Sequence, residues 1–158
     1  MIIVIIGQSG CGKTTFAKNN FLQGELEIIP DIVPYTTNGE FCAIGKYGVG
    51  IRTEGTDTLS YNSGNKICEL IKKLHTGKKN ILLEGYWVVN HKLFEFFSML
   101  NTDIKLYLIT CSLKTSLTRL KAAGSKITLP FLKKTRSRSR NLFLQYAAKF
   151  NGEIIRND

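Results

Sequence analysis

The sequence predicts an α/β fold in which a parallel β-sheet lies between layers of helices. The chain opens with an uninterrupted apolar run, residues 1–6, which is typical of a central strand covered on both faces. Residues 81–85 and 104–110 form two further apolar runs, and segments of helical periodicity separate the three. Strands that alternate with helices of this length indicate a parallel sheet with right-handed crossovers. The 158 residues suffice for one hydrophobic core, so a single domain over 1–158 is expected.

Turn residues and periodicity predict the remaining elements. A helix is expected from Lys13 to about Leu22, and a short strand over 26–29 stops at Pro30. Residues 32–63 are rich in Gly, Thr, Asn and Tyr and are interpreted as an inserted loop or hairpin, with β-like pieces near 41–44 and 48–52. Further helices are expected around 67–76, 91–100, 113–123 and 130–150, before a last strand over 153–156.

The positive charge is concentrated in one region. The chain carries 22 Lys and Arg against 12 Asp and Glu, a net charge of +10. Residues 104–152 contain no acid and eleven of the cations, so the remainder, with 11 cations against 12 acids, is close to neutral. No stretch approaches the roughly 20 apolar residues of a membrane helix. Because the four cysteines (Cys11, Cys42, Cys68 and Cys111) lack metal or redox spacing, we expect a soluble protein of a reducing cytoplasm without a membrane partner.

A phosphate-binding loop follows the first strand. The segment Gly7-Gln8-Ser9-Gly10-Cys11-Gly12-Lys13-Thr14 fits the pattern G-x-x-x-x-G-K-[ST] at every fixed position. Its glycines let the backbone turn tightly and aim N–H groups at phosphate oxygens, and the next helix adds its positive dipole end. The pattern predicts a nucleoside triphosphate as partner, with Lys13 on the β and γ phosphates and the Thr14 hydroxyl on Mg²⁺. The other predicted contacts are Gly7, Ser9, Gly10, Cys11, Gly12 and Thr15.

With this loop, the chain resembles the nucleoside and nucleotide kinase branch of P-loop proteins. Residues 81–85, an apolar strand that ends in Glu84 and a glycine, resemble a further motif of that branch. The strand and helix that lead to Arg119, and the arginine-rich segment 133–140, resemble its next elements. The resemblance implies a three-layer P-loop kinase fold, ATP and Mg²⁺ as cofactors, and a short basic lid at about 120–142.

The resemblance also implies transfer of the γ-phosphate to a hydroxyl group. Lys13, Mg²⁺ and a lid arginine, of which Arg136 is the candidate, would neutralise the transferred group. Three acids are candidates for the base: Asp31, Asp57 and Glu84. In related kinases the base follows the second strand, which favours Asp31, and Glu84 could instead hold the magnesium shell through water. Arg119 is either a nucleotide contact or an ordinary helix-surface residue.

Two further groups of residues are open to two interpretations. Arg136 and Arg140 share a helical face that Arg138 does not, and they either reach phosphates or are solvated. Tyr86 and Trp87 follow the carboxyl end of a strand, where open α/β sheets bind ligands, and they either stack on a base or belong to the core.

The identity of the phosphate acceptor has to be inferred from charge and from a further resemblance. A region of eleven cations without an acid is typical of a surface that binds a polyanion, and nucleic acid is the obvious candidate. Residues 43–47 and 55–60 are similar to segments of phage-encoded P-loop kinases, including those that phosphorylate 5-hydroxymethyluracil within DNA. That likeness implies a hydroxymethylated pyrimidine base in DNA as acceptor, a base that leaves the stack, and a location in the host cytoplasm.

Two alternatives remain from the sequence. One is a kinase of a free nucleotide or other small metabolite, and the other is a nucleotide-dependent switch that hydrolyses without transfer. The chain has no N-K-x-D motif of guanine-binding GTPases and no L-S-G-G-Q signature of ABC ATPases.

Overall fold

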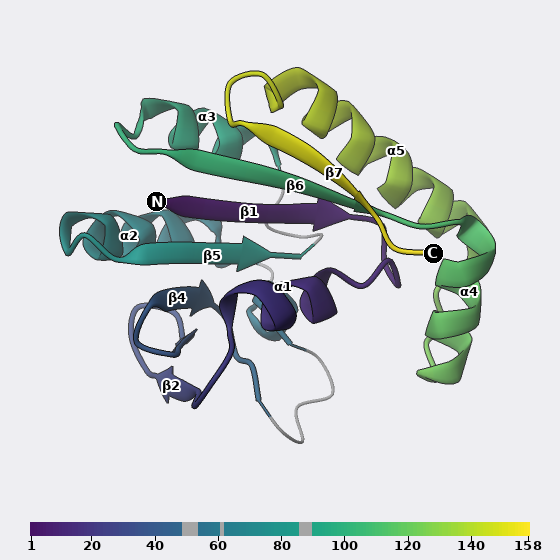
Figure 1. Ribbon diagram of the computed structural model, residues 1–158, viewed down its shortest axis with the longest axis horizontal. Helices are drawn as coiled ribbons and strands as arrows, with labels where there is room; N and C mark the ends of the chain where they lie inside the picture. Colours follow the sequence, from purple (N-terminus) through teal and green to yellow (C-terminus); the bar gives the residue numbers. More distant parts are fainter. Residues whose placement is uncertain (49–53, 61, 86–89) are drawn as a thin grey trace.

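The computed structural model describes residues 1–48, 54–60, 62–85 and 90–158, which form a seven-stranded sheet with helices on both faces (Figure 1). The strands are β1 Ile2–Gly7, β2 Glu27–Ile29, β3 Tyr35–Thr37, β4 Phe41–Ile44, β5 Asn80–Glu84, β6 Ile104–Thr110 and β7 Gly152–Arg156. Their order across the sheet is β2-β3-β4-β5-β1-β6-β7. The five strands from β4 to β7 in that order are parallel, whereas β2 and β3 pair antiparallel. The predicted α/β architecture is confirmed.

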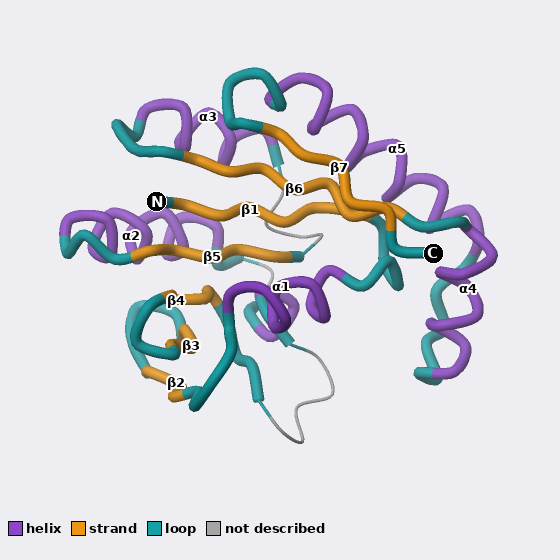
Figure 2. The backbone as a smooth tube through the Cα atoms, viewed as in Figure 1, coloured by secondary structure: helices purple, strands orange, loops and turns teal. Residues whose placement is uncertain are grey.

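Two layers of helices cover the sheet (Figure 2). The helices are α1 Lys13–Phe21, α2 Gly64–Thr76, α3 His91–Met99, α4 Leu113–Ala122 and α5 Leu129–Tyr146, with a short 3-10 helix, η1, over Thr56–Thr58. Apolar residues of α2, α3 and α5 pack on one face of the sheet, and those of α1 pack on the other. The layers therefore follow from alternation along each strand.

The central strand β1 shows why the sheet forms here. Its residues from Ile2 to Ile6 are all 1% exposed or less, and successive side chains enter the two apolar clusters in turn. Each is β-branched, which suits a strand buried on both faces. The register pairs Ile5 with Glu84 on β5 and Gly7 with Ile109 on β6. The loop after β1 and the acid of β5 consequently meet at the carboxyl edge of the sheet.

The region around 32–63 contains the largest difference from the predicted order. The hairpin is present, because β3 and β4 pair antiparallel, and the piece near 41–44 is β4. The piece near 48–52 falls mostly outside the described residues. The short strand expected over 26–29 is present as β2, but it is the outer strand and pairs antiparallel with β3, whereas β4 occupies the place beside β5 in the parallel part of the sheet. The reason is burial: all four residues of β4 are buried, while Glu27 and Ile28 of β2 are exposed.

The predicted lid region is a continuation of the helical layer. It comprises the end of α4, the connection 123–128 and most of α5. From Leu132 onwards α5 packs on the sheet, with Leu132, Thr135, Ser139 and Leu142 all buried. This part of the region is thus a core-packed helix, and only the preceding stretch projects from the sheet layer. Across the described ranges, no helix is long and apolar enough to cross a membrane.

We predict that Gly45→Ala destabilises the fold far more than Gly39→Ala. Both glycines have positive φ, +100° and +89°, which costs an alanine roughly 1 kcal/mol. A Cβ at Gly45 would also collide with the backbone carbonyl of Gly55, whereas a Cβ at Gly39 meets nothing within 4 Å. Urea unfolding should give a loss of about 1 kcal/mol for Gly39→Ala and about 3 kcal/mol or more for Gly45→Ala. Equal losses would contradict the close approach of Gly45 to the Gly55 carbonyl.

Candidate active site

Hydrogen bonds to the C-terminal third of the chain hold the phosphate-binding loop in place. Gln8, which is buried, donates from Nε2 to Ser116 Oγ at 2.6 Å and to the Cys111 carbonyl at 3.2 Å. On the other side Asn157 Nδ2 donates to the Cys11 carbonyl at 2.9 Å. Gly12 has a φ of +89° and ends the loop at the start of α1. These contacts fix the curvature that the loop needs to direct its N–H groups at an anion.

Lys13 lies across the loop with its charge turned inwards. The residue is buried, and Nζ donates to the Gln8 carbonyl at 3.1 Å. Its charge lowers the pKa of Glu84 and of Asp57 against the larger opposing effect of burial, so both carboxylates lie within its field. The ammonium thus stands between the loop and two acids, and it can leave the carbonyl for a phosphate oxygen.

The hydroxyl of Thr14 and the carboxylate of Glu84 are joined across the sheet edge. Thr14 Oγ1 donates to Glu84 Oε1 at 2.7 Å. Glu84 is 3% exposed, and burial raises its pKa above the usual value although Lys13 and Thr14 oppose the shift. Two hard oxygens this close suit Mg²⁺, which takes one or two protein ligands and completes its octahedron with phosphate oxygens and water. The described residues contain no cluster of three or more His, Cys, Asp or Glu that could hold a metal ion.

Gly55, Thr56 and Asp57, which follow β4 in the chain, form a wall of the site. Thr56 Oγ1 donates to the Glu84 carbonyl at 2.6 Å, and this bond docks η1 on the carboxyl end of β5. Asp57, the next residue, is exposed at the rim of the site. Partial desolvation of its carboxyl by neighbouring groups raises the pKa of that carboxyl. Gly55 leaves no room for a side chain, because a Cβ there would contact Glu84 and Tyr47. The wall therefore places a second carboxylate beside the first.

Tyr47 contributes a buried hydroxyl beside Glu84. The residue is 1% exposed, and its Oη has no hydrogen-bond partner among the described residues. Burial, and then the charge of Glu84, raise the pKa of Tyr47 well above its usual value. Tyr47 is therefore a neutral phenol whose proton is available to an oxygen at this edge.

A cavity of about 570 Å³ opens next to Asp57. It lies between η1 and the amino-terminal ends of α2 and α3. The lining includes the apolar side chains of Leu59, Ile67 and Leu93 together with hydroxyl and amide groups. A volume of this size is typical of small-molecule sites. The cavity and the phosphate-binding loop thus flank the acidic pair from two sides.

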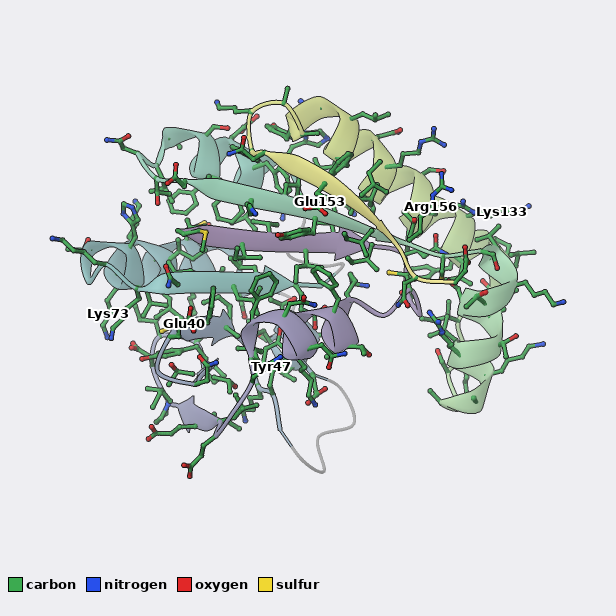
Figure 3. The ribbon with its side chains drawn as sticks, in the orientation of Figure 1. Glu40, Tyr47, Lys73, Lys133, Glu153 and Arg156 are labelled. Carbon is green, nitrogen blue, oxygen red and sulfur yellow. The ribbon has the colours of Figure 1, made fainter. Side chains whose placement is uncertain are left out.

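Asp31 is placed elsewhere. It accepts from Lys73 Nζ at 2.7 Å, and this bond lowers the pKa of its carboxyl. Figure 3 shows Lys73 near the amino ends of β1 and β5, whereas the loop and Glu84 lie at the carboxyl ends of these strands. The structure does not bring Asp31 to Glu84, and the cause is the outer position of β2.

The predicted cations lie on two elements. Arg119 on α4 donates to the Asn157 carbonyl at 3.0 Å, and the same asparagine holds the loop at Cys11. Arg136 and Arg140 on α5 line one cavity of about 450 Å³, which confirms that they share a face. Of the remaining predicted contacts, Thr15 is exposed in the first turn of α1, and Tyr86 and Trp87 lie outside the described residues.

Several site residues were not singled out by sequence reasoning. Gln8 fills a variable position of the loop pattern, Tyr47 and Thr56 lie in the segments 43–47 and 55–60 without a role assigned to them, and Asn157 belongs to no motif. Asp57 ranked behind Asp31 and Glu84. One signal was present: residues 41–44 form a wholly apolar run, as a strand beside β5 requires. Given that strand, the segment that follows it must reach the carboxyl edge, and Asp57 lies in that segment.

Comparison with known proteins adds a likeness of architecture. No family model matches the chain, and no curated protein matches it. Among solved structures, deoxyadenosine kinase from M. mycoides with bound dATP is 13% identical, with a TM-score of 0.49 over 99% of this chain and 91% of that one. The same enzyme with bound dCTP gives 13% and 0.49 over 99% and 90%. Its form with the products dCMP and dCDP gives 13% and 0.48 over 98% and 89%. At these values the likeness carries no information on the substrate of this chain.

We predict that Glu84→Gln raises stability at neutral pH. The native pKa of Glu84 lies above its unfolded value, so the native state favours the protonated form, and the ionised carboxylate opposes folding at higher pH. Glutamine removes this cost, and a gain of about 1 kcal/mol would raise Tm by roughly 2–4 °C. The difference from the parent should narrow as pH falls through the native pKa towards the unfolded one. Thermal unfolding between pH 4 and 8 measures it, and a lower Tm for the variant at pH 7 would contradict the assigned burial cost.

Proposed function

We propose that the chain is an ATP-dependent, Mg²⁺-requiring phosphotransferase that moves the γ-phosphate of ATP to a hydroxyl group held in the cavity beside Asp57. One observation carries the proposal: Asp57 lines that cavity and lies within the field of Lys13. A base that faces an acceptor cavity on one side and the phosphate-binding lysine on the other is the arrangement that in-line transfer requires.

The donor would be bound by the loop. Its N–H groups hold phosphate oxygens, and Lys13 exchanges the Gln8 carbonyl for the β and γ phosphates. Thr14 and Glu84 would hold the magnesium ion, which when bound neutralises charge on the β and γ phosphates. Tyr47, whose buried hydroxyl lies close to Glu84 on the same side of Gly55, would donate its proton to this carboxylate and hold it in place.

Asp57 would then act as general base. The acceptor oxygen forms a bond to the γ-phosphorus as the bond from that phosphorus to the β,γ-bridging oxygen breaks, and the hydroxyl proton passes to the Asp57 carboxylate. ADP and the phosphorylated acceptor leave. The raised pKa of Asp57 suits this role, because a stronger base accepts the proton more readily near neutral pH.

The cavity limits the acceptor to a group of nucleoside or nucleobase size. Our specific proposal is a hydroxymethylated pyrimidine base in DNA, flipped out of the stack. It is supported by the acid-free basic region, whose Lys114, Arg119, Lys121, Lys133, Lys134, Arg136 and Arg140 are exposed on α4 and α5. A free nucleoside or nucleotide would fit the same cavity and is the alternative. A nucleotide-dependent switch that hydrolyses ATP without transfer would not require a base that faces an acceptor cavity.

An acceptor screen with ATP labelled on the γ-phosphate separates these substrates. We predict label in DNA that contains hydroxymethylated pyrimidines and none in unmodified DNA of the same sequence. Label in free nucleosides or nucleotides alone would replace the DNA proposal and retain the kinase. Release of label as inorganic phosphate only, with every acceptor, would contradict phosphotransfer itself. Lys13→Ala is the control that should abolish all transfer while the fold is retained.

We predict that Asp57→Asn lowers kcat by roughly 10²- to 10⁴-fold with little change in the affinity for ATP, because it removes the base and leaves the loop intact. Asp31→Asn is the matched control, the same chemical change at an acid paired with Lys73, and should retain near-parent kcat. Steady-state transfer assays measure both. A large loss of kcat in Asp31→Asn, together with a normal kcat in Asp57→Asn, would identify Asp31, in the turn after β2, as the base.

A further inference from the structure

We propose that the cavity of about 450 Å³ between α5 and β7 is a second anion site, which binds a phosphate group of a ligand separately from the phosphate-binding loop. This site is defined by its own lining residues and is independent of the kinase proposal. Three arginines from two elements line it: Arg136 and Arg140 from α5 and Arg156 from β7. Figure 3 shows Arg156 at the end of β7 under α5.

Backbone geometry explains how these residues converge. At 3.6 residues per turn, Arg136 and Arg140 lie on the flank of α5 next to the buried Ser139, and Arg138 lies on the opposite flank. On the sheet, Arg156 pairs in register with Thr110 of β6, so both side chains point to the face that α5 covers. Since β7 is the edge strand, the site is open on its outer side.

The three guanidinium groups outnumber the acids that line the cavity. Within the described part of the chain, no ion pair or side-chain hydrogen bond involves Arg136, Arg140 or Arg156, and all three are exposed. The lining contains one acid, Asp158, whose carboxylate accepts from the backbone amide of Ser112. Three cations against one acid leave the cavity with an excess of two positive charges. Arginine forks match the geometry of phosphate oxygens, so an unpaired set around a cavity favours a phosphate as ligand.

The site is distinct from the loop. Among the described residues of the lining, Gln8 is the one that comes from the loop, and its amide is already bonded to Ser116 and Cys111. The loop N–H groups and Lys13 do not take part. Beside the arginines the lining also has Leu144 and Ile154, which are 66% and 54% exposed. An apolar flank next to a phosphate site suits a ligand that carries more than phosphate, either a free nucleotide or a nucleic acid strand.

The test is isothermal titration of the full chain with its loop first saturated by Mg²⁺ and a non-hydrolysable ATP analogue. Three probes are then added in turn: inorganic pyrophosphate, ADP and a 12-nucleotide thymidine strand. We expect pyrophosphate to bind, and Arg140→Gln and Arg156→Gln each to weaken binding about tenfold, the loss of one charge-assisted contact. Lys134→Gln, on the other flank of the same helix, removes one charge outside the cavity and should leave the binding of pyrophosphate unchanged. Unfolding midpoints near that of the parent confirm that each variant is folded.

The outcomes separate the sources of the phosphate. Tighter binding of ADP than of pyrophosphate, lost in the arginine variants, assigns the site to a free nucleotide. Tighter binding of the strand, with a salt dependence that the same variants flatten, assigns it to nucleic acid. Absence of binding by all three probes overturns the site, and so does an equal loss of pyrophosphate binding in Lys134→Gln, because a general surface charge effect would then explain the result.

Discussion

The carboxylate of Glu84 is buried at the carboxyl end of β5, and most of the surrounding architecture serves to make that burial tolerable. A buried charge without partners would cost far more than the fold can supply, so polar groups must surround it. Thr14 donates to it, Lys13 supplies the opposite charge, and Thr56 anchors the backbone at the same residue. These partners come from two segments, since Lys13 and Thr14 begin α1 and Thr56 lies in η1. Because the Glu84 carboxylate needs these polar partners, the loop after β1 and the wall after β4 both contact Glu84.

The two cavities lie on opposite sides of the phosphate-binding loop. The cavity beside Asp57 lies where η1 meets α2 and α3, on the β4–β5 side of the loop, and the arginine cavity lies on the β6–β7 side. Both open at the carboxyl edge of the parallel strands, where an open α/β sheet has no covering layer. A ligand with a reactive group on one side and phosphates on the other could occupy this edge across the sheet.

The sequence was sufficient for the parallel sheet and the loop, because both follow from local pattern, whereas Glu84, 70 residues from Thr14, was singled out through the resemblance to P-loop kinases. Apolar runs form buried strands, and the glycine pattern fixes a turn whatever surrounds it. It was insufficient for Asp57 and Arg156. Their places depend on strand order, and strand order depends on which hairpin strand is buried beside β5, a non-local choice. Asp31 shows the consequence: it follows an actual strand, but that strand lies at the outer edge, so its carboxylate pairs with Lys73 instead.

We propose that Thr14 and Glu84, which are hydrogen-bonded to each other, act together on one magnesium ion. A double-mutant cycle tests it most directly: Thr14→Ala, Glu84→Gln and the double variant are compared for the Mg²⁺ concentration that half-saturates binding of a non-hydrolysable ATP analogue. If the two oxygens serve one ion, each single variant raises that concentration about tenfold, and the double variant raises it little further. Two effects that multiply in the double variant, or a Mg²⁺ requirement that Glu84→Gln leaves unchanged, would contradict the account.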